Sequence, residues 1–483
     1  MRSPEECAIR VDGARAAHWP GMGRRRGGLA LILALLLAGG PGCAHYRVNV
    51  PLAVAQPQVA PGHRLAEERD DDLLLVLAFS GGGLRSAALA YGVLEVLRDV
   101  PIERQGRTES LLDQVDMISA VSSGSFVAAY YGLFGGRIFD EFEARFLKAD
   151  LQNRLARSVL APPNWFRLLS DTYDRVDLAA EYIDRNLFEG LTFADLAERS
   201  RTATLINATD LVTGERFEFT QAQFDLICSD LDAFPVARAV AASSAFPFLL
   251  SPVRLRNYAG RCDYRPPEWL VDAEDESPDA PRRHAEALRS YLDAGARPYI
   301  HLLDGGISDN LGLRSVLDAL APRHSLWAAP RGSALRSARD VAVIVVNGGA
   351  AVEPGLSRDE RSPGLRDTFR AVTSAQVNRY NDATMDLARR SLEAWLAEAA
   401  VARLRGGGEP MSARLHLVSV NLDELPRSAE RDALRALPTN FSLEARDVDR
   451  VREAAHALLH GSPEFARLTA ALQDPRGQEE TAK

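Results

Sequence analysis

The chain has 483 residues, of which 46% are hydrophobic and 25% charged, and its formal net charge is −9. This length allows one large α/β domain or two smaller ones, with enough apolar residues for a sizeable core. An acidic chain without a basic field does not attract nucleic acid, so nucleic-acid binding is excluded as a function class.

The first 43 residues have the layout of a secretory signal peptide. A basic cluster at Arg24–Arg26 precedes an apolar run over 29–38, and small residues follow up to Cys43. About ten apolar residues are too few to span a bilayer. The end of this stretch resembles the lipobox of bacterial lipoproteins, with Gly40 and Pro41 as departures. We therefore expect export to the periplasm or cell envelope and membrane anchoring through a lipid on Cys43; cleavage without lipidation is the alternative.

After a Pro- and charge-bearing stretch at 44–70, which we interpret as a tether, apolar strands alternate with amphipathic helices. Strands are predicted at 73–80, 115–122, 202–210, 298–306, 340–349 and 413–422, and helices at 85–100, 124–134, 139–158, 177–200, 284–295, 365–400 and 442–472. Strands separated by helices indicate an α/β fold with a mostly parallel sheet and helices on its faces. The polar, Pro-rich stretch 260–283 is predicted to be a surface excursion.

A glycine-rich turn joins the first of these strands to its helix. The sequence FSGGGLRS places Gly81, Gly82 and Gly83 before Arg85. Glycines at a helix N-terminus allow backbone N–H groups to face a developing negative charge. A dinucleotide-binding turn is the alternative, but its third glycine is absent and no ribose-binding acid is evident on a second strand.

A second strand-to-helix turn has small residues two positions before and two positions after a serine. In AVSSG, Ala120 and Gly124 flank Ser122 in this way, as a nucleophile elbow requires because its backbones come close together. By itself this pattern is more often typical of close helix packing. A third turn, in HLLDGGISDNLGL, places Asp304 at the end of a strand before Gly305 and Gly306. The carboxylate could close a turn, or it could serve as a base for the serine.

These three motifs, in this order and with ASSAFPFLLSP between the last two, resemble the patatin-like phospholipase family over roughly residues 73–350. The resemblance implies a three-layer α/β/α core at 71–350, with an α/β extension at 351–483 packed on it. It also implies a serine lipid acyl hydrolase that acts through an acyl-enzyme and needs no cofactor. Phospholipid is the expected substrate class, with neutral lipid or lysophospholipid as the alternatives. Ala120 replaces the first glycine of the elbow and Ser86 the last glycine of the loop.

By this resemblance, Ser122 is the nucleophile and Asp304 the base of a Ser–Asp dyad. Gly81, Gly82 and Gly83, with Arg85 beside them, form the oxyanion hole. Arg85 could stabilise the oxyanion, hold a substrate phosphate or orient the glycine loop. A non-catalytic lipid-binding envelope protein and a broad-specificity esterase or thioesterase are the alternative functions.

Other chemistries find less support in the sequence. Six histidines follow Ser122, but none lies in a loop after a final strand, where a catalytic triad would place one. No spacing of histidine, cysteine and acidic residues predicts a metal site. In an oxidising compartment Cys228 and Cys262 are expected to form a disulfide, with two separate buried thiols as the alternative. The segment 157–177 is either a lipid-contacting surface or a buried helix, and 236–253 lines an acyl pocket, packs in the core, or does both.

Overall fold

The computed structural model describes residues 49–52, 73–104, 107–247, 249–271, 280–321, 338–349, 360, 362–405 and 413–473. The predicted signal peptide and Cys43 lie outside the described residues. None of the helices within these ranges is both long enough and apolar enough to cross a membrane.

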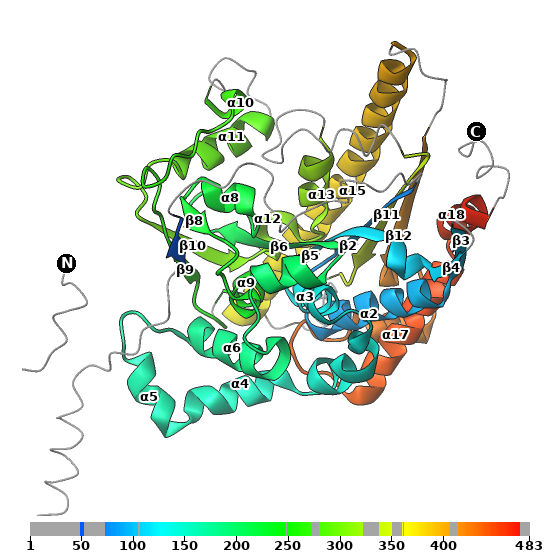
Figure 1. Cartoon of the computed structure of the whole chain (residues 1–483). Helices are drawn as coiled ribbons and strands as arrows, with labels where there is room; N and C mark the ends of the chain where they lie inside the picture. The colour runs from blue at the N-terminus through cyan, green and yellow to red at the C-terminus, as the bar shows by residue number, and fades with distance from the viewer. Residues whose placement is uncertain are drawn as a thin grey trace, which may run out of the picture.

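Within the described residues, a mixed sheet of eight strands forms the centre of the molecule (Figure 1). Its strands are β2 (Leu73–Phe79), β5 (Val115–Val121), β6 (Ala203–Asp210), β7 (Arg216–Glu218), β9 (Val253–Arg256), β10 (Tyr299–Asp304), β11 (Asp340–Asn347) and β12 (Arg414–Asn421). Their order is β12-β11-β2-β5-β6-β10-β9, with β7 beside β6. The strands from β12 to β6 are parallel, and both β7 and β10 are antiparallel to β6. The predicted mostly parallel sheet is confirmed.

Helices cover both faces of this sheet. One face carries α2 (Leu84–Asp99), α3 (Ser123–Phe134), α9 (Val236–Ser243) and α17 (Ala445–His460); the other carries α13 (Leu313–Leu320) and α15 (Leu365–Arg405). Strand β2 packs against both layers, because successive side chains of a strand point to opposite faces. Its odd-numbered residues, Leu73 to Phe79, join the first layer, and its even-numbered residues, Leu74 to Ala78, join the second. This explains its unbroken apolar sequence and confirms the three-layer architecture.

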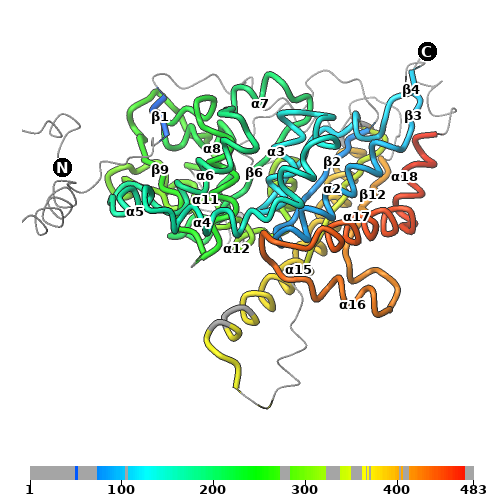
Figure 2. Tube along the Cα trace, turned by 90° about the horizontal axis from the view of Figure 1, so that it is seen from below, coloured from blue at the N-terminus to red at the C-terminus, as the bar shows by residue number. Residues whose placement is uncertain are grey.

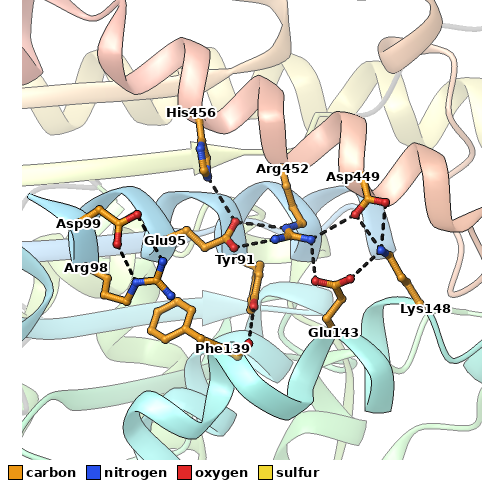
Figure 3. A network of polar contacts seen from close by, with 10 residues as sticks. All are labelled: Tyr91, Glu95, Arg98, Asp99, Phe139, Glu143, Lys148, Asp449, Arg452 and His456. Carbon is orange, nitrogen blue, oxygen red and sulfur yellow. Dashed lines mark hydrogen bonds and ion pairs between the residues drawn. The ribbon is translucent and has the colours of Figure 1, made fainter.

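The C-terminal part of the chain completes this core. All eight residues of β12 pair with β11. Helix α17 lies so close along α2 that a Cβ added to Gly92 would be 2.8 Å from the Ala455 Cβ. Arg452 of α17 forms ion pairs of 2.6 Å with both Glu95 and Glu143 (Figure 3). The predicted extension therefore shares the sheet with the core and contributes α17 to one helical layer and α15 to the other.

Three helices predicted as continuous are interrupted. The predicted helix 139–158 is a π-helical segment, η5 (Ile138–Leu147), followed by α4 (Leu151–Leu160), and Asp150 between them has a positive φ of 46°. The predicted helix 177–200 consists of α6 (Arg175–Ile183), the π-helical η6 (Asp184–Phe188) and α7 (Phe193–Arg199). The last one divides into α17 and α18 (Pro463–Gln473), because a proline ring cannot continue a preceding helix.

The remaining helices and strands of the described chain are short. They are β1 (Val50–Pro51), β3 (Pro101–Arg104), β4 (Arg107–Ser110), η3 (Leu111–Gln114), η4 (Gly135–Arg137), α5 (Pro162–Leu168), α8 (Gln221–Asp225), β8 (Ser229–Asp230), α10 (Glu268–Val271), α11 (Ala280–Ser290), α12 (Gly306–Asp309), η9 (Leu422–Glu424) and α16 (Ala429–Arg435). The predicted surface excursion at 260–283 therefore contains α10 and the start of α11.

Part of the predicted tether is held on the body. Strand β1 pairs with β8, and the Asn49 side chain exchanges hydrogen bonds with the Arg256 backbone at 2.7 and 2.9 Å. The Leu52 amide donates to the Cys228 carbonyl at 2.8 Å. Cys228 forms a disulfide with Cys262, so the covalent link lies beside the strand that β1 extends. Residues 49–52 are thus part of the folded domain.

Candidate active site

Ser122 lies in a sharp turn between β5 and α3. Its φ is 51° and its ψ −124°, a backbone conformation that residues with a side chain rarely adopt. Such conformations cost about 1–3 kcal/mol and persist where the surrounding structure enforces them, commonly at functional sites. The side chain is 6% exposed. This geometry is that of a nucleophile elbow.

The small residues around the turn allow this close approach. A Cβ added to Gly124 would lie 2.7 Å from the Phe79 carbonyl oxygen, so α3 can pass the end of β2 only with glycine there. Ala120 pairs with Phe79 and Ile206 as an ordinary strand residue and does not have a positive φ. Alanine therefore replaces glycine at this position without strain.

Asp304, at the end of β10, faces Ser122. The Ser122 Oγ donates a hydrogen bond of 2.8 Å to Asp304 Oδ2, and the Gly306 amide donates one of 2.8 Å to Oδ1. Gly305 makes the turn possible, since an added Cβ would be 2.3 Å from the Asn207 carbonyl oxygen. The structure thus brings together the serine and the aspartate that the sequence motifs suggested.

Burial raises the pKa of Asp304 from 3.8 to about 6, while the hydrogen bonds from Gly306 and Ser122 act in the opposite direction. A desolvated carboxylate is a stronger base than one in water, because its charged form has lost hydration. At neutral pH the group is mostly ionised, yet its pKa lies near the working range of a general base.

Ser243, at the end of α9, connects the two halves of the site. Its hydroxyl accepts a hydrogen bond from the Ser122 amide at 2.7 Å and donates one to the Asn207 carbonyl at 2.6 Å. Its own carbonyl accepts from the Gly305 amide at 3.1 Å. One residue therefore fixes both the elbow and the turn after Asp304. The segment containing Ser243 was noted in the sequence, but nothing there indicated this contact.

The glycine loop approaches the site with its backbone. Gly82 and Gly83 have φ values of 142° and 69°, and their N–H groups form no hydrogen bond with any other described residue. An added Cβ on Gly83 would be 2.4 Å from the Asn440 carbonyl oxygen. Gly81 differs, because its N–H donates to the Asn310 carbonyl at 3.0 Å. The prediction that Gly81 supplies an oxyanion donor is therefore wrong for its amide.

The contacts of Arg85 distinguish between the three roles considered for it. Its side chain is buried, and its Nε donates to the Gly348 carbonyl at 2.8 Å. Its other nitrogens donate to the carbonyls of Gly349 and Leu437. Burial lowers the pKa of Arg85 to about 10, so the guanidinium remains charged at neutral pH. With its donors directed at main-chain carbonyls, Arg85 ties two loops to the start of α2, which favours the third of those roles, orientation of the glycine loop.

Ser86, the other departure from the family motif, fits its surroundings. Its hydroxyl donates to the Ser80 carbonyl at 2.7 Å and lies 3.0 Å from the Ser80 hydroxyl. The Ser80 hydroxyl in turn accepts from the Gly348 amide at 2.9 Å. Ser86 thus stabilises the same loops that Arg85 holds.

The histidines of the described residues pair with acidic side chains or make no hydrogen bond to Ser122 or Asp304. His416 pairs with Asp340 at 2.8 Å, His456 contacts Glu95, and His284 contacts Glu215 and Asp318. Neither Ser122 nor Asp304 accepts or donates a hydrogen bond to a histidine in the part of the chain that the structure describes. Over the same ranges, no group of three or more histidine, cysteine or acidic side chains could hold a metal ion. His324 lies outside the described residues.

Exposed apolar side chains either lie near Asp304 in the sequence or follow a residue that is hydrogen-bonded to it. Phe246 and Leu249 follow Ala245, whose carbonyl accepts a hydrogen bond from the Asp304 amide at 3.1 Å. Ile307, three residues after Asp304, is also exposed. Apolar residues beside a buried polar pair are typical of a site for a ligand with a hydrocarbon part.

The three sequence motifs lie in a region that matches a known protein family. Residues 77–317 match the family model described as patatin-like phospholipase. This stretch is a patatin-like phospholipase domain. Strands β11 and β12 and helices α15 and α17 lie beyond it. The family assignment supports lipid hydrolase activity.

Among solved structures, human GIVD cytosolic phospholipase A2 matches at 12% identity with a TM-score of 0.40, covering 84% of this chain and 63% of that chain. The same enzyme in complex with methyl gamma-linolenyl fluorophosphonate and terbium chloride matches at 13% identity and a TM-score of 0.40, covering 84% and 60%. VipD from Legionella pneumophila matches at 13% identity and a TM-score of 0.26, covering 92% and 78%. The chain spans less than two thirds of the length of the human enzyme. No curated protein matches the chain.

Proposed function

We propose that the patatin-like phospholipase domain is a serine lipid acyl hydrolase of the phospholipase A or lysophospholipase type, with Ser122 as nucleophile and Asp304 as base. The observation that carries this proposal is the hydrogen bond of 2.8 Å between Ser122 Oγ and Asp304 Oδ2, two side chains 182 residues apart. Because a serine hydroxyl is a weak nucleophile, it needs a base within this distance to accept its proton.

The reaction would proceed in two halves. Asp304 takes the proton of Ser122 as Oγ attacks the ester carbonyl carbon, and the tetrahedral intermediate expels the alcohol, which leaves with the proton from Asp304. Water then attacks the acyl-serine, giving its proton to Asp304, and the fatty acid departs as Ser122 regains its hydrogen. A pKa of about 6 suits a group that alternates between base and acid in this way.

The N–H groups of Gly82 and Gly83 are the proposed oxyanion donors. They lie in the turn that precedes α2, where the helix N-terminus also favours negative charge. Donors fixed in place before the reaction stabilise the intermediate at no cost of reorganisation, and the loss of one reduces the rate roughly 10²- to 10³-fold. Asn440 and the Arg85-bound loops hold this turn in position.

The proposed substrate is a phospholipid or lysophospholipid, presented at a membrane surface. Exposed Phe246, Leu249 and Ile307 near the dyad provide apolar contacts for an acyl chain. We also propose that the protein acts in the cell envelope after export, anchored through Cys43. The disulfide between Cys228 and Cys262 supports this location, because such bonds persist in oxidising compartments.

A fluorophosphonate probe, which forms a covalent adduct with an activated serine, tests the proposal. We expect labelling of the wild type and none of Ser122→Ala. Ser158→Ala is the matched control, because the Ser158 hydroxyl donates to the Arg154 carbonyl within its own helix. Equal labelling of Ser122→Ala would contradict the assignment, and a folded wild type that resists labelling would favour a non-catalytic lipid-binding protein. Comparison of phospholipid vesicles with short soluble esters separates a lipase from a broad esterase.

A further inference from the structure

Helices α4 and α5 form a peripheral segment, residues 151–170, with an apolar end. Both Figure 1 and Figure 2 show α5 at the edge of the molecule. Four large apolar side chains of this segment are exposed: Leu160 by 69%, Trp165 by 54%, Phe166 by 47% and Leu169 by 70%. Trp165 and Leu169 are one helical turn apart and share a face, with Phe166 beside them. Of the predicted stretch 157–177, the part around α5 is therefore an exposed surface, whereas Tyr173 and Val176 at its end are buried.

The charge of the same segment opposes that of the whole chain. Residues 151–170 carry Arg154, Arg157 and Arg167 and no acidic residue, in a protein of net charge −9. Arg154 and Arg157 are exposed on α4, whereas Arg167 pairs with Glu181 at 2.5 Å. Exposed aromatic and leucine side chains next to arginines are typical of segments that lie in the interface of an anionic membrane.

The α4–α5 segment is connected to the glycine loop through residues 440–441. The Gln152 amide at the start of α4 donates to the Phe441 carbonyl at 3.2 Å, and the Gln152 side chain accepts from the Phe441 amide at 3.4 Å. The neighbouring Asn440 accepts from the Leu84 amide at 2.8 Å and covers Gly83. If a surface binds the α4–α5 segment, the glycine loop is therefore also kept close to that surface.

We propose that the α4–α5 segment docks the protein on a bilayer containing anionic phospholipid. Trp165, Phe166 and the two leucines enter the interface, while Arg154 and Arg157 lie at the level of the phosphates. The proposal builds on the proposed function, since it places the ester-cleaving site at the surface where its substrate is found. In a symmetric contact between two copies, Arg154 and Arg157 of one segment would face the same arginines of the other, so charge complementarity favours anionic lipid.

Vesicle co-sedimentation tests the docking separately from catalysis. The exported full chain is used in a Cys43→Ser background, so that no attached lipid contributes. Vesicles contain either phosphatidylcholine alone or phosphatidylcholine with about one third phosphatidylglycerol. The variants are Trp165→Ser/Phe166→Ser and Arg154→Gln/Arg157→Gln. The matched control is Val401→Ser/Leu404→Ser, because these side chains are exposed by 47% and 53%. They belong to the C-terminal end of α15, which lies far from α5 in Figure 1.

We expect the Trp165/Phe166 variant to lose at least about tenfold in partitioning to the anionic vesicles, and the control variant to bind like the parent protein. The arginine variant is expected to lose the preference for phosphatidylglycerol. Hydrolysis of a short soluble ester should be unchanged in both segment variants. Their folding is checked by thermal unfolding.

Three results would overturn the docking proposal: no binding of the parent protein to anionic vesicles, equal binding by the Trp165/Phe166 variant, or a dimer of the parent protein that this variant abolishes. The last result would identify the segment as an interface between two copies. Because binding is measured without turnover, a parent protein that binds vesicles but cleaves no ester would refute the proposed function and leave the docking supported.

Discussion

Replacement of Asp304 by asparagine should abolish turnover and at the same time stabilise the fold at neutral pH. Asparagine keeps the size of the side chain and its hydrogen-bonding capacity but carries no charge. The wild-type carboxylate is buried, and its pKa is raised from 3.8 to about 6. Because one pKa unit corresponds to about 1.4 kcal/mol, holding the ionised group in the folded protein costs about 3 kcal/mol at most.

The sign of the effect on stability follows from the direction of the Asp304 pKa shift. A carboxylate whose pKa is higher in the folded state binds its proton more tightly there than in the unfolded state. The cost is therefore absent below pH 3.8, grows between pH 3.8 and about 6, and is complete above that range. Asp304→Asn should exceed the wild type in free energy of unfolding by up to about 3 kcal/mol at pH 7–8, and the difference should vanish near pH 4.

Urea unfolding of both proteins at a series of pH values measures this difference, and ester hydrolysis measures turnover. Turnover of the variant should fall at least about 10³-fold, and wild-type kcat/KM should decrease about tenfold for each pH unit below pH 6 as Asp304 becomes protonated. A variant that is less stable than the wild type by the same amount at every pH would refute the burial argument. Unchanged turnover would identify another base.

Three further changes test separate parts of the structure. Gly124→Ala should cost about 1–3 kcal/mol of stability, measured by urea unfolding, because its Cβ would lie 2.7 Å from a main-chain oxygen of β2; an unaffected midpoint would contradict the close packing. Ser243→Ala should lower kcat about 10- to 100-fold with little change in KM, because Ser122 loses the hydroxyl that holds its amide; a change confined to KM would argue for substrate contact instead. Joint replacement of Cys228 and Cys262 by serine opens a link spanning 34 residues and should cost about 3–4 kcal/mol of stability; equal thermal unfolding of the oxidised wild type and the variant would contradict this.

The continuous apolar strands and the proximity of Ser122 to Asp304 were predictable from the sequence. Strand β2 and residues Val341 to Val346 of β11 are buried on both faces, so their unbroken apolar runs carry a strong signal. The elbow was recognisable because close backbone contacts allow few residue types at its two flanking positions. The same physical reason explains Gly305, which has no room for a side chain.

Other features of the structure had no local signal in the sequence. Sequence spacing does not show which groups already have hydrogen-bond partners. It therefore places Gly81 and Arg85 beside an oxyanion hole, although the Gly81 amide donates to the Asn310 carbonyl and the Arg85 guanidinium donates to three other carbonyls. Ser243 resembles its neighbouring serines until the fold places it beside the elbow. The π-helical segments η5 and η6 interrupt apolar periodicity too little to be predicted.

The central claim is that an acyl group passes through Ser122. A phospholipid with a short acyl chain is mixed with the protein, the reaction is stopped in acid within milliseconds, and the proteolytic peptides are weighed by mass spectrometry. The account predicts a transient acyl adduct on the peptide that contains Ser122, and none in Ser122→Ala. An adduct on a different residue, or hydrolysis by Ser122→Ala at the wild-type rate, would contradict it.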